Sequence, residues 1–403
     1  MHVRIVDYVL NPGGVARVIV EMLRGFRTLG AAVSFEVVSY GPAAEEYISL
    51  FRTERLVVPV TQIRPPHWWS NLPPQRLFNV RGTGHLMKLL GRRGKWDWEL
   101  PAAAFQDCDV VWLPFMHRHR IPSSFAHKVV ASCHDLLPIE EPVIPEQDRA
   151  IEIQLTRENL ASAARIVANS RTTRDSIVRF FGNNPARISV IPFSTEHLRK
   201  ASRQKLVNPL GELPFILCPA YATPHKNQGI LIRAFARWRE RADCRLVLIG
   251  RWTNLADCAE PWSKLLRELA ESLGLRLGVD LLGLGHVPSE TRDALLLNAK
   301  AVVMPTLYEG FGLPLGEGVI AGVPVIASDI PALREQAETL GAGILWFDPH
   351  DADSLAARLR ELQDNYSAFK RKAVEQVDQI RRRTWAEVAE EHLRVFQTAT
   401  AWR

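Results

Sequence analysis

The sequence predicts an α/β protein built from two Rossmann-like domains. Three observations lead to this prediction: the chain has 403 residues, its apolar runs alternate between strand and helix patterns, and the alternation begins again after Pro214. Single hydrophobic cores stop growing at roughly 250–300 residues, so a chain of this length is expected to divide. Alternating strands and helices are typical of parallel sheets covered by helices on both faces.

The first half opens with a strand, a glycine turn and a helix. Val3–Leu10 is a continuous apolar run, which favours a parallel strand buried on both faces. Residues 11–14 (Asn-Pro-Gly-Gly) break the run, and Val15–Thr28 follows with helical apolar spacing before Gly30. Further strands are expected at Ala32–Ser39, Asp109–Pro114, Lys128–His134, Arg165–Ser170 and Ile188–Pro192, and further helices at Gln147–Ala164 and Thr172–Phe181.

The second half repeats this organisation after a polar, basic segment at 196–213, which we interpret as a linker. The first domain is therefore expected at 1–195 and the second at 214–383, with a cleft between them. In the second domain we expect strands at Phe215–Pro219, Arg245–Gly250, Val279–Leu282, Ala301–Met304 and Val323–Ala327, and helices at Gly229–Arg241 and Pro261–Leu273.

Residues 61–101 depart from the alternation because prolines, tryptophans and basic residues crowd together there. Leucines and basic residues between 86 and 93 could share one basic amphipathic helix. One interpretation is an irregular excursion that packs on its own domain. The other is a patch that contacts an acceptor or a membrane surface, since Trp, Arg and Lys suit that interface.

Composition narrows the class of protein. The net charge is +6, from 50 Lys and Arg against 44 Asp and Glu, which suits an anionic ligand or surface. No nucleic-acid-binding signature is present, so we exclude nucleic acid as a partner. The five cysteines form no C-x-x-C pair, as expected of reduced thiols in a cytoplasmic protein. No apolar run reaches the ~18 residues of a membrane span.

The most informative stretch is Ala301–Asp329. A buried strand is followed by a turn, Glu309-Gly310-Phe311-Gly312, and a helix is expected from Leu313-Pro314 onward. The glycines allow close approach of a ligand, and the free N–H groups at a helix start favour phosphate.

Two carboxylates accompany this turn. Glu309 lies where the strand ends, which is the ligand-binding edge of an open α/β sheet, and Glu317 lies about one turn into the helix. Beside a diphosphate they would accept hydrogen bonds from hydroxyl groups, one from the transferred sugar and the other from the ribose. The alternative is that both glutamates only stabilise the start of a helix.

The motif YEGFGLPLGE, with seven residues between Glu309 and Glu317, resembles the signature of the family-four retaining glycosyltransferases. The later GVPVIASD and FDPHDADSLAARL continue the likeness. The resemblance implies the GT-B fold of two Rossmann-like domains, and donor contacts from Glu309, Gly310, Phe311, Gly312, Leu313 and Glu317. It also implies that the last helix, expected at Thr384–Gln397, returns to the first domain, which adds 384–403 to that domain.

The loop PAYATPHKNQG at 219–229 resembles the family's diphosphate-binding loop and implies that Lys226 binds the donor diphosphate. A bound phosphate would explain a cation at the positive end of a helix. Many members have an arginine after the first loop glycine, where this sequence has Ala220-Tyr221. His225 or Arg251 is the candidate substitute.

The first domain carries two further resemblances. Gly13 and Gly14 match the family's first loop, which approaches donor and acceptor; an ordinary tight turn is the alternative. His134, in HDLLP, resembles the reaction-centre histidine of many mannosyltransferases, whereas the alternative is a strand-end histidine paired with Asp135. With Lys226 and Glu309, His134 completes the predicted catalytic set.

No metal site is expected. Asp107-Cys108-Asp109 spells the metal-binding Asp-x-Asp motif of another glycosyltransferase fold, in which the motif follows a strand and faces the nucleotide. Here it precedes the strand, so we expect it to cap a surface edge. Phosphate charge is left to Lys226 and helix N–H groups, with no obligatory cofactor.

We therefore predict a retaining, metal-independent hexosyltransferase for saccharide or lipid-linked saccharide acceptors, acting in polysaccharide biosynthesis. The HDLLP and TPHKN segments favour mannose from GDP-mannose, with UDP-sugars open. The protein is expected in the cytoplasm, with a peripheral contact at the inner membrane face through residues 61–101. A nucleotide-sugar epimerase and a catalytically inactive scaffold are the alternatives, and a dehydrogenase is excluded because the first turn lacks G-x-G-x-x-G.

Overall fold

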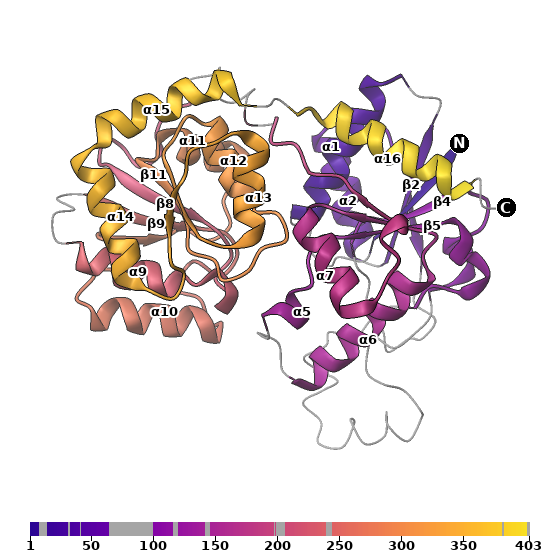
Figure 1. Ribbon diagram of the computed structural model, residues 1–403, viewed down its shortest axis with the longest axis horizontal. Coiled ribbons are helices and arrows are strands. Elements are labelled where there is room, and N and C mark those ends of the chain that lie inside the picture. The colour runs from indigo at the N-terminus through magenta and orange to yellow at the C-terminus, as the bar shows by residue number, and fades with distance from the viewer. Residues whose placement is uncertain are drawn as a thin grey trace. The chain divides into compact units, whose positions relative to one another are not determined.

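The computed structural model describes residues 1–7, 14–30, 33–40, 42–63, 100–115, 120–141, 146–196, 198, 206–238, 244–380 and 383–400. The chain forms two compact units (Figure 1): one of Met1–Phe193 with Thr384–Arg403, and one of Ser194–Arg383. Most of the unusual 61–101 segment lies outside the described residues, so its two interpretations stay predictions.

The sheet of the first unit is parallel throughout its described strands. Their order is β3-β2-β1-β4-β5-β6-β7. The strands are β1 (His2–Val6), β2 (Ser34–Tyr40), β3 (Val60–Ile63), β4 (Val110–Leu113), β5 (Val129–Cys133), β6 (Arg165–Ala168) and β7 (Ile188–Val190).

Helices cover both faces of this sheet. They are α1 (Gly14–Thr28), α2 (Pro42–Thr53), α5 (Leu137–Glu140), α6 (Glu146–Ser162), α7 (Arg171–Phe181) and the C-terminal α16 (Trp385–Thr400), with short 3-10 turns η2 (Ala102–Ala104), η3 (Ser123–Lys128) and η4 (Pro185–Arg187). Alternate strand residues enter two core clusters, because successive side chains of a strand point to opposite faces. Val3 and Ile5 of β1 lie in one cluster, and Val6 lies in the other.

The C-terminal helix α16 packs against α1, as Figure 1 also shows, and its Val388 and Phe396 are fully buried in the first unit's core. The close approach depends on Gly25 of α1, where a Cβ atom would lie 2.3 Å from the carbonyl oxygen of Trp385. The prediction that the last helix returns to the first domain is therefore confirmed.

The second unit contains another parallel sheet, with strand order β10-β9-β8-β11-β12-β13. Its strands are β8 (Phe215–Pro219), β9 (Arg245–Ile249), β10 (Leu281–Gly283), β11 (Ala301–Met304), β12 (Val325–Ser328) and β13 (Leu345–Phe347). Its helices are η5 (Pro224–Lys226), α9 (Gln228–Arg237), α10 (Pro261–Ser272), α11 (Ser289–Asn298), α12 (Leu313–Ile320), α13 (Pro331–Leu340), α14 (Ala352–Asp364) and α15 (Tyr366–Gln379).

Both sheets have the strand order of a Rossmann fold. Numbered within each unit, the first six strands run 3-2-1-4-5-6. In such sheets the chain leaves the first and fourth strands in opposite directions, so a crevice forms beyond their carboxyl ends and ligands bind there. In the second unit this switch point lies between β8 and β11, the strands that precede Lys226 and Glu309.

Some element boundaries differ from the sequence-based expectation. The strand expected at Val279–Leu282 is found at Leu281–Gly283, because Arg276–Asp280 forms a turn in which the Asp280 carboxylate accepts from the backbone N–H of Arg276. In the segment interpreted as a linker, Leu198 is fully buried in the core of the second unit.

Candidate active site

Lys226 and Glu309 meet at the switch point of the second unit. Lys226 lies in η5, after β8, and Glu309 lies in the turn between β11 and α12. The Lys226 Nζ atom donates to Glu309 Oε1 at 2.6 Å, and the two side chains are only 21% and 13% exposed. These two predicted site residues are therefore in direct contact, although 83 positions separate them in the sequence.

Hydrogen bonds connect the loops that carry this pair. The carbonyl of His225 accepts from the backbone N–H of Leu307 at 2.8 Å and from the hydroxyl of the buried Thr306 at 3.0 Å. Asn227 adopts a left-handed backbone with φ of 53° and donates its side-chain amide to the carbonyl of Pro349 at 2.9 Å. Lys226 is thus carried on a turn fixed from two sides.

The glycine turn has a structural use that the sequence interpretation did not anticipate. Gly312 precedes α12 with φ of 85°, and a Cβ atom there would lie 2.2 Å from Leu333 Cδ2. A Cβ atom on Gly316 would lie 3.0 Å from Thr195 and 3.1 Å from Gln336. Gly312 thus adopts a conformation that other residues rarely adopt, and a side chain at Gly316 would require Thr195 or Gln336 to shift slightly.

The remaining predicted donor contacts lie around the start of α12. Gly310 is buried, whereas Phe311 and Leu313 are half-buried. Leu313 is the first residue of the helix and Pro314 the second, so the proline ring removes an N–H that the helix would leave without a partner anyway. The start of α12 is thereby positioned next to the Glu309 turn.

Glu317 is nearly buried in α12 and has a cationic neighbour. Its side chain is 6% exposed, and Arg292 of α11 places Nη1 3.6 Å from Glu317 Oε1. Arg292 also donates through Nη2 and Nε to Asp293 at 2.6 and 3.1 Å. Burial lowers the pKa of Arg292, but the carboxylates of Glu317 and Asp293 outweigh this effect and raise it. Sequence reasoning missed Arg292; the available signal was an Arg-Asp pair directly before the apolar run Ala294–Leu297.

Of the two candidates for the missing cation near Tyr221, only Arg251 carries a positive charge at neutral pH. Burial, with a smaller contribution from the neighbouring Lys226, lowers the pKa of His225 to about 3. Arg251 follows β9, and its carbonyl accepts from the backbone N–H of Ala222 at 3.0 Å. Its guanidinium lies 4.5 Å from the centre of the Trp252 ring. Arg251 thus lies beside the 219–229 loop, at the same sheet edge.

In the first unit, His134 follows the carboxyl end of β5. Its Nε2 lies 2.5 Å from the carbonyl oxygen of Pro114, so Nε2 carries the hydrogen and donates. Its buried Nδ1 has no hydrogen-bond partner among the described residues. Burial lowers the pKa of His134 to about 4, although the Pro114 contact opposes this effect. The Asp135 carboxylate accepts from the backbone N–H of Leu137 at 3.1 Å.

A hollow adjoins His134 at this edge. Phe115, which follows β4, and aromatic and aliphatic side chains of α5, α6 and α7 form much of its wall, with Asp135, Glu152 and Thr156 as polar groups. Of the two glycines predicted in the first loop, Gly14 is the first residue of α1. Gly13 lies outside the described residues.

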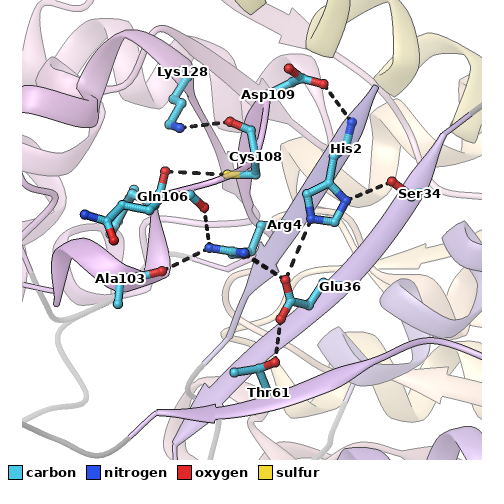
Figure 2. Close-up of polar contacts among 11 residues, drawn as sticks. His2, Arg4, Ser34, Glu36, Thr61, Ala103, Gln106, Cys108, Asp109 and Lys128 are labelled. Carbon is cyan, nitrogen blue, oxygen red and sulfur yellow. Dashed lines mark hydrogen bonds and ion pairs between the residues drawn. The ribbon is translucent and has the colours of Figure 1, made fainter.

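The opposite, amino edge of the same sheet holds the Asp-x-Asp motif (Figure 2). Asp109 directly precedes β4; its carboxylate accepts from the backbone N–H of His2 at 2.8 Å, and its own N–H donates to the His2 carbonyl at 2.9 Å. Asp107 has φ of 53°. The motif therefore caps the sheet on the edge remote from the β-strand carboxyl ends. In the described ranges, no three His, Cys, Asp or Glu side chains gather in a metal-binding cluster.

Two family models match the chain. The model for Glycosyl transferases group 1 matches residues 199–381, and the model for Glycosyltransferase Family 4 matches residues 12–193. The chain belongs to the family-four glycosyltransferases. The predicted resemblance is confirmed. The match over 12–193 lies inside the first expected domain, whereas the match over 199–381 begins in the segment interpreted as a linker.

Characterised relatives of this glycosyltransferase include mannosyltransferases. It is 29% identical to O-antigen chain mannosyltransferase B of Escherichia coli over 248 residues, which is 59% of this chain and 62% of that protein. It is also 29% identical to MMP alpha-(1->4)-mannosyltransferase of Mycolicibacterium hassiacum over 241 residues, or 58% of this chain and 53% of that one. The match thus spans a little over half the length of these curated relatives.

Solved structures share the fold of this glycosyltransferase. Anabaena Alr3699/HepE in complex with UDP-glucose has a TM-score of 0.66 at 16% identity, covering 99% of this chain and 100% of that chain. WaaG, a glycosyltransferase involved in lipopolysaccharide biosynthesis, has a TM-score of 0.61 at 16% identity, covering 98% and 99%. The predicted GT-B fold is confirmed. Within the described part of the chain, no helix is long and apolar enough to cross a membrane.

Proposed function

We propose that the chain is a retaining hexosyltransferase that moves a sugar from a nucleotide-diphosphate donor to a saccharide or lipid-linked saccharide. The observation that carries this proposal is the contact of Lys226 with Glu309 at the switch point of the second unit, 2.6 Å apart. It brings a cation suited to phosphate and a carboxylate suited to sugar hydroxyls to one sheet edge. Membership in the family-four glycosyltransferases supports the same reaction.

In this proposal the second unit holds the donor. Lys226 and the N–H groups at the start of α12 bind the diphosphate, and the Gly310–Leu313 segment borders it. Glu309 accepts hydrogen bonds from the transferred sugar, and Glu317 from the ribose. Because the Lys226 ammonium has three hydrogens, it can keep its contact with Glu309 and donate to a phosphate oxygen at the same time.

The first unit contributes His134 to the proposed reaction centre. Its ring is neutral at physiological pH, and Nδ1 is the nitrogen that can accept a hydrogen bond. A hydroxyl of the donor sugar or of the acceptor is the partner that this atom suits. The glycines of the first loop, Gly13 and Gly14, are proposed to let the backbone approach the substrates.

The proposed chemistry is substitution on one face of the sugar. The bond from the anomeric carbon to the diphosphate oxygen breaks, and the acceptor oxygen forms its bond on the same face. The leaving phosphate takes the acceptor's proton. Lys226 neutralises the charge that grows on the diphosphate, so no metal ion is required in this role.

The names of the two mannosyltransferase relatives and the HDLLP segment favour GDP-mannose as the donor, with UDP-sugars as the second choice. The relative that acts on the O-antigen chain favours a surface polysaccharide as the acceptor. We place the reaction in the cytoplasm, with residues 61–101 as a candidate contact with the membrane face.

Incubation of the protein with GDP-mannose or a panel of UDP-sugars, with and without oligosaccharide acceptors, tests this function. We expect acceptor-dependent release of nucleotide diphosphate and a product whose anomeric configuration, measured by NMR, matches the donor. An inverted product would contradict the retaining mechanism. Interconversion of the donor sugar without an acceptor would indicate the epimerase, and binding without any turnover would indicate the inactive scaffold.

A further inference from the structure

The nearly buried carboxylate of Glu317 lies next to a cation. Its side chain is 6% exposed, although it lies only one turn into α12. A buried carboxylate is costly in free energy unless charged or polar partners compensate for the lost water. Arg292 supplies a positive charge 3.6 Å away, from a different helix.

Arg292 is itself held in place. Its Nε and Nη2 atoms donate to the Asp293 carboxylate at 3.1 and 2.6 Å, so one edge of the planar guanidinium is fixed. The remaining nitrogen, Nη1, then lies toward Glu317. The Arg292 side chain is 20% exposed and that of Asp293 14%, so little water screens the contact between Arg292 and Glu317.

The length of the contact matters. At 3.6 Å, Arg292 acts on Glu317 through charge and not through a tight hydrogen bond, in contrast to Lys226 and Glu309 at 2.6 Å. Arg292 can therefore attract and orient the Glu317 carboxylate without making a short hydrogen bond to Oε1. Two neighbouring hydroxyls, as in a ribose, suit an oriented carboxylate because both donate hydrogen bonds.

We infer that Arg292 is a positioning residue that acts through Glu317 to set the affinity for the nucleotide part of the donor. This inference rests on the proposed function, in which Glu317 holds the ribose. Arg292 touches no reacting atom, so its contribution is made equally in the ground state and the transition state. Such uniform binding changes KM and leaves kcat nearly constant.

The test is a double-mutant cycle measured by steady-state kinetics with the donor as the varied substrate. Arg292→Met removes the charge at similar length, and we expect donor KM to rise about tenfold with kcat within about threefold of the unmutated protein. Arg292→Lys restores the charge and should recover most of the affinity. In a Glu317→Gln background, Arg292→Met should change KM by less than about twofold.

Arg276→Met is the matched control, because Arg276 pairs with Asp280 at 2.8 Å on the exposed surface of the same unit. It should leave both constants unchanged. Thermal unfolding is measured for every variant, and Arg292→Gln replaces Arg292→Met if the latter does not fold. A loss of thermal stability with unchanged KM would overturn the inference and leave Arg292 a purely structural residue.

The inference and the proposed function fail differently. If Glu317→Gln raises KM and the Arg292 variants do not, only the role of Arg292 is wrong. An effect of Arg292→Met that persists undiminished in the Glu317→Gln background would also overturn it, since Arg292 would then act by another route. If Glu317→Gln itself leaves KM unchanged, the proposed donor site is wrong and the inference is overturned with it.

Discussion

The polar side chains at the two edges of the first unit's sheet differ in their hydrogen-bond partners. At the amino edge, Arg4 donates to Glu36 at 2.9 Å and to the carbonyls of Ala103 and Gln106 (Figure 2). Glu36 also accepts from the hydroxyl of Thr61. At the carboxyl edge, the buried Nδ1 of His134 has no partner among the described residues.

This difference separates a structural network from a candidate binding group. Buried polar atoms in folded proteins nearly always have a hydrogen-bond partner, so an exception calls for an explanation such as a ligand. The Arg4 network needs none, since protein groups satisfy it. The carboxyl edge of the second sheet also carries charge, in Lys226 and Glu309, which suggests that both carboxyl edges face substrates. The following predictions test this contrast, from the largest expected effect to the smallest.

Lys226→Ala should give the largest loss of activity with the fold intact. Contacts that neutralise charge growing in the transition state are typically worth ~3–4 kcal/mol, which corresponds to a loss of roughly 10²–10³-fold in kcat/KM. Lys264→Ala, on the exposed surface of α10, is the control and should have no effect. A loss below about tenfold would show that another cation, such as Arg251, carries this role.

The two glutamates should divide the kinetic effects between them. Glu309→Gln is expected to lower kcat by about 10²-fold, because hydrogen bonds to the transferred sugar tighten as its bond breaks. Glu317→Gln should mainly raise the KM for the donor, because the ribose changes little during reaction. Both substitutions keep side-chain size. The test is to measure kcat and the donor KM for both variants. If Glu317→Gln lowers kcat and Glu309→Gln does not, the two roles are reversed.

His134 should influence activity as a neutral ring. Because its pKa is about 4, the folded protein does not protonate it between pH 5.5 and 8, so kcat/KM should show no His134 step in that range. The unfolded chain has the ordinary value near 6.5. The contribution of neutral His134 to the free energy of unfolding should therefore be fully present above about pH 6.5. It should be lost as the pH falls toward 4, because the unfolded chain binds the proton at a higher pH than the folded protein does.

His134→Phe tests both statements about His134. It should lower kcat/KM by about tenfold, since the hydrogen-bond acceptor is lost. It should also flatten the decline in thermal stability between pH 6.5 and 4. His127 is an exposed histidine of η3, close to the start of β5, and His127→Phe is the control that should change neither quantity. An unchanged kcat/KM for His134→Phe would place His134 among the structural residues of the carboxyl edge.

Much of this site followed from the sequence, because its residues lie next to strong local signals. The buried runs before Glu309 and Lys226 and the glycine turn after Glu309 predict that both residues lie at the carboxyl edge of a sheet. Their direct contact could not be predicted, since it depends on β8 and β11 being neighbours in the sheet. The strand order is set by packing of the whole unit, which no local pattern encodes.

Arg292 illustrates the other limit of sequence reasoning. Its helix α11 was not predicted, and its importance arises from a contact with Glu317, 25 positions away on another helix. The Asp-x-Asp motif shows the reverse case: its position before a strand was enough to predict that it caps a surface edge, and Asp109 is found at the amino edge of the sheet. Local order along the chain predicts which edge a residue occupies, whereas side-chain partners require the fold.

Arg4→Met should destabilise the protein without impairing catalysis. Arg4 is 11% exposed, and its loss removes a charged donor from two carbonyls and from the Glu36 carboxylate, which keeps the Thr61 hydroxyl. Hydrogen bonds to charged groups typically contribute ~1.5–3 kcal/mol of stability. Although burial raises the pKa of Glu36, the hydrogen bond from Thr61 and the charge of Arg4 keep it below its usual value. We expect a lower Tm and an unchanged kcat. A large drop in kcat at full folding would contradict the structural reading of this edge.

Removal of divalent metal should have the smallest effect. Asp109, the residue of the Asp-x-Asp motif nearest the strand, already exchanges two hydrogen bonds with the His2 backbone at the amino edge. A metal ion that assisted a diphosphate would have to lie at a carboxyl edge of a sheet. Ligands of open α/β sheets bind at this edge, where helix N-termini favour phosphate. We therefore expect EDTA to leave the rate unchanged, and Asp107→Asn with Asp109→Asn to leave kcat unchanged while slightly lowering Tm.

The rate is measured in EDTA-treated buffer and again after adding manganese or magnesium. Suppose that EDTA abolishes the activity of the unmutated protein, that either ion restores it, and that the double variant shows no such restoration. The motif would then bind a metal ion that the reaction needs. Loss and restoration that persist in the double variant would instead mean that other residues bind the ion.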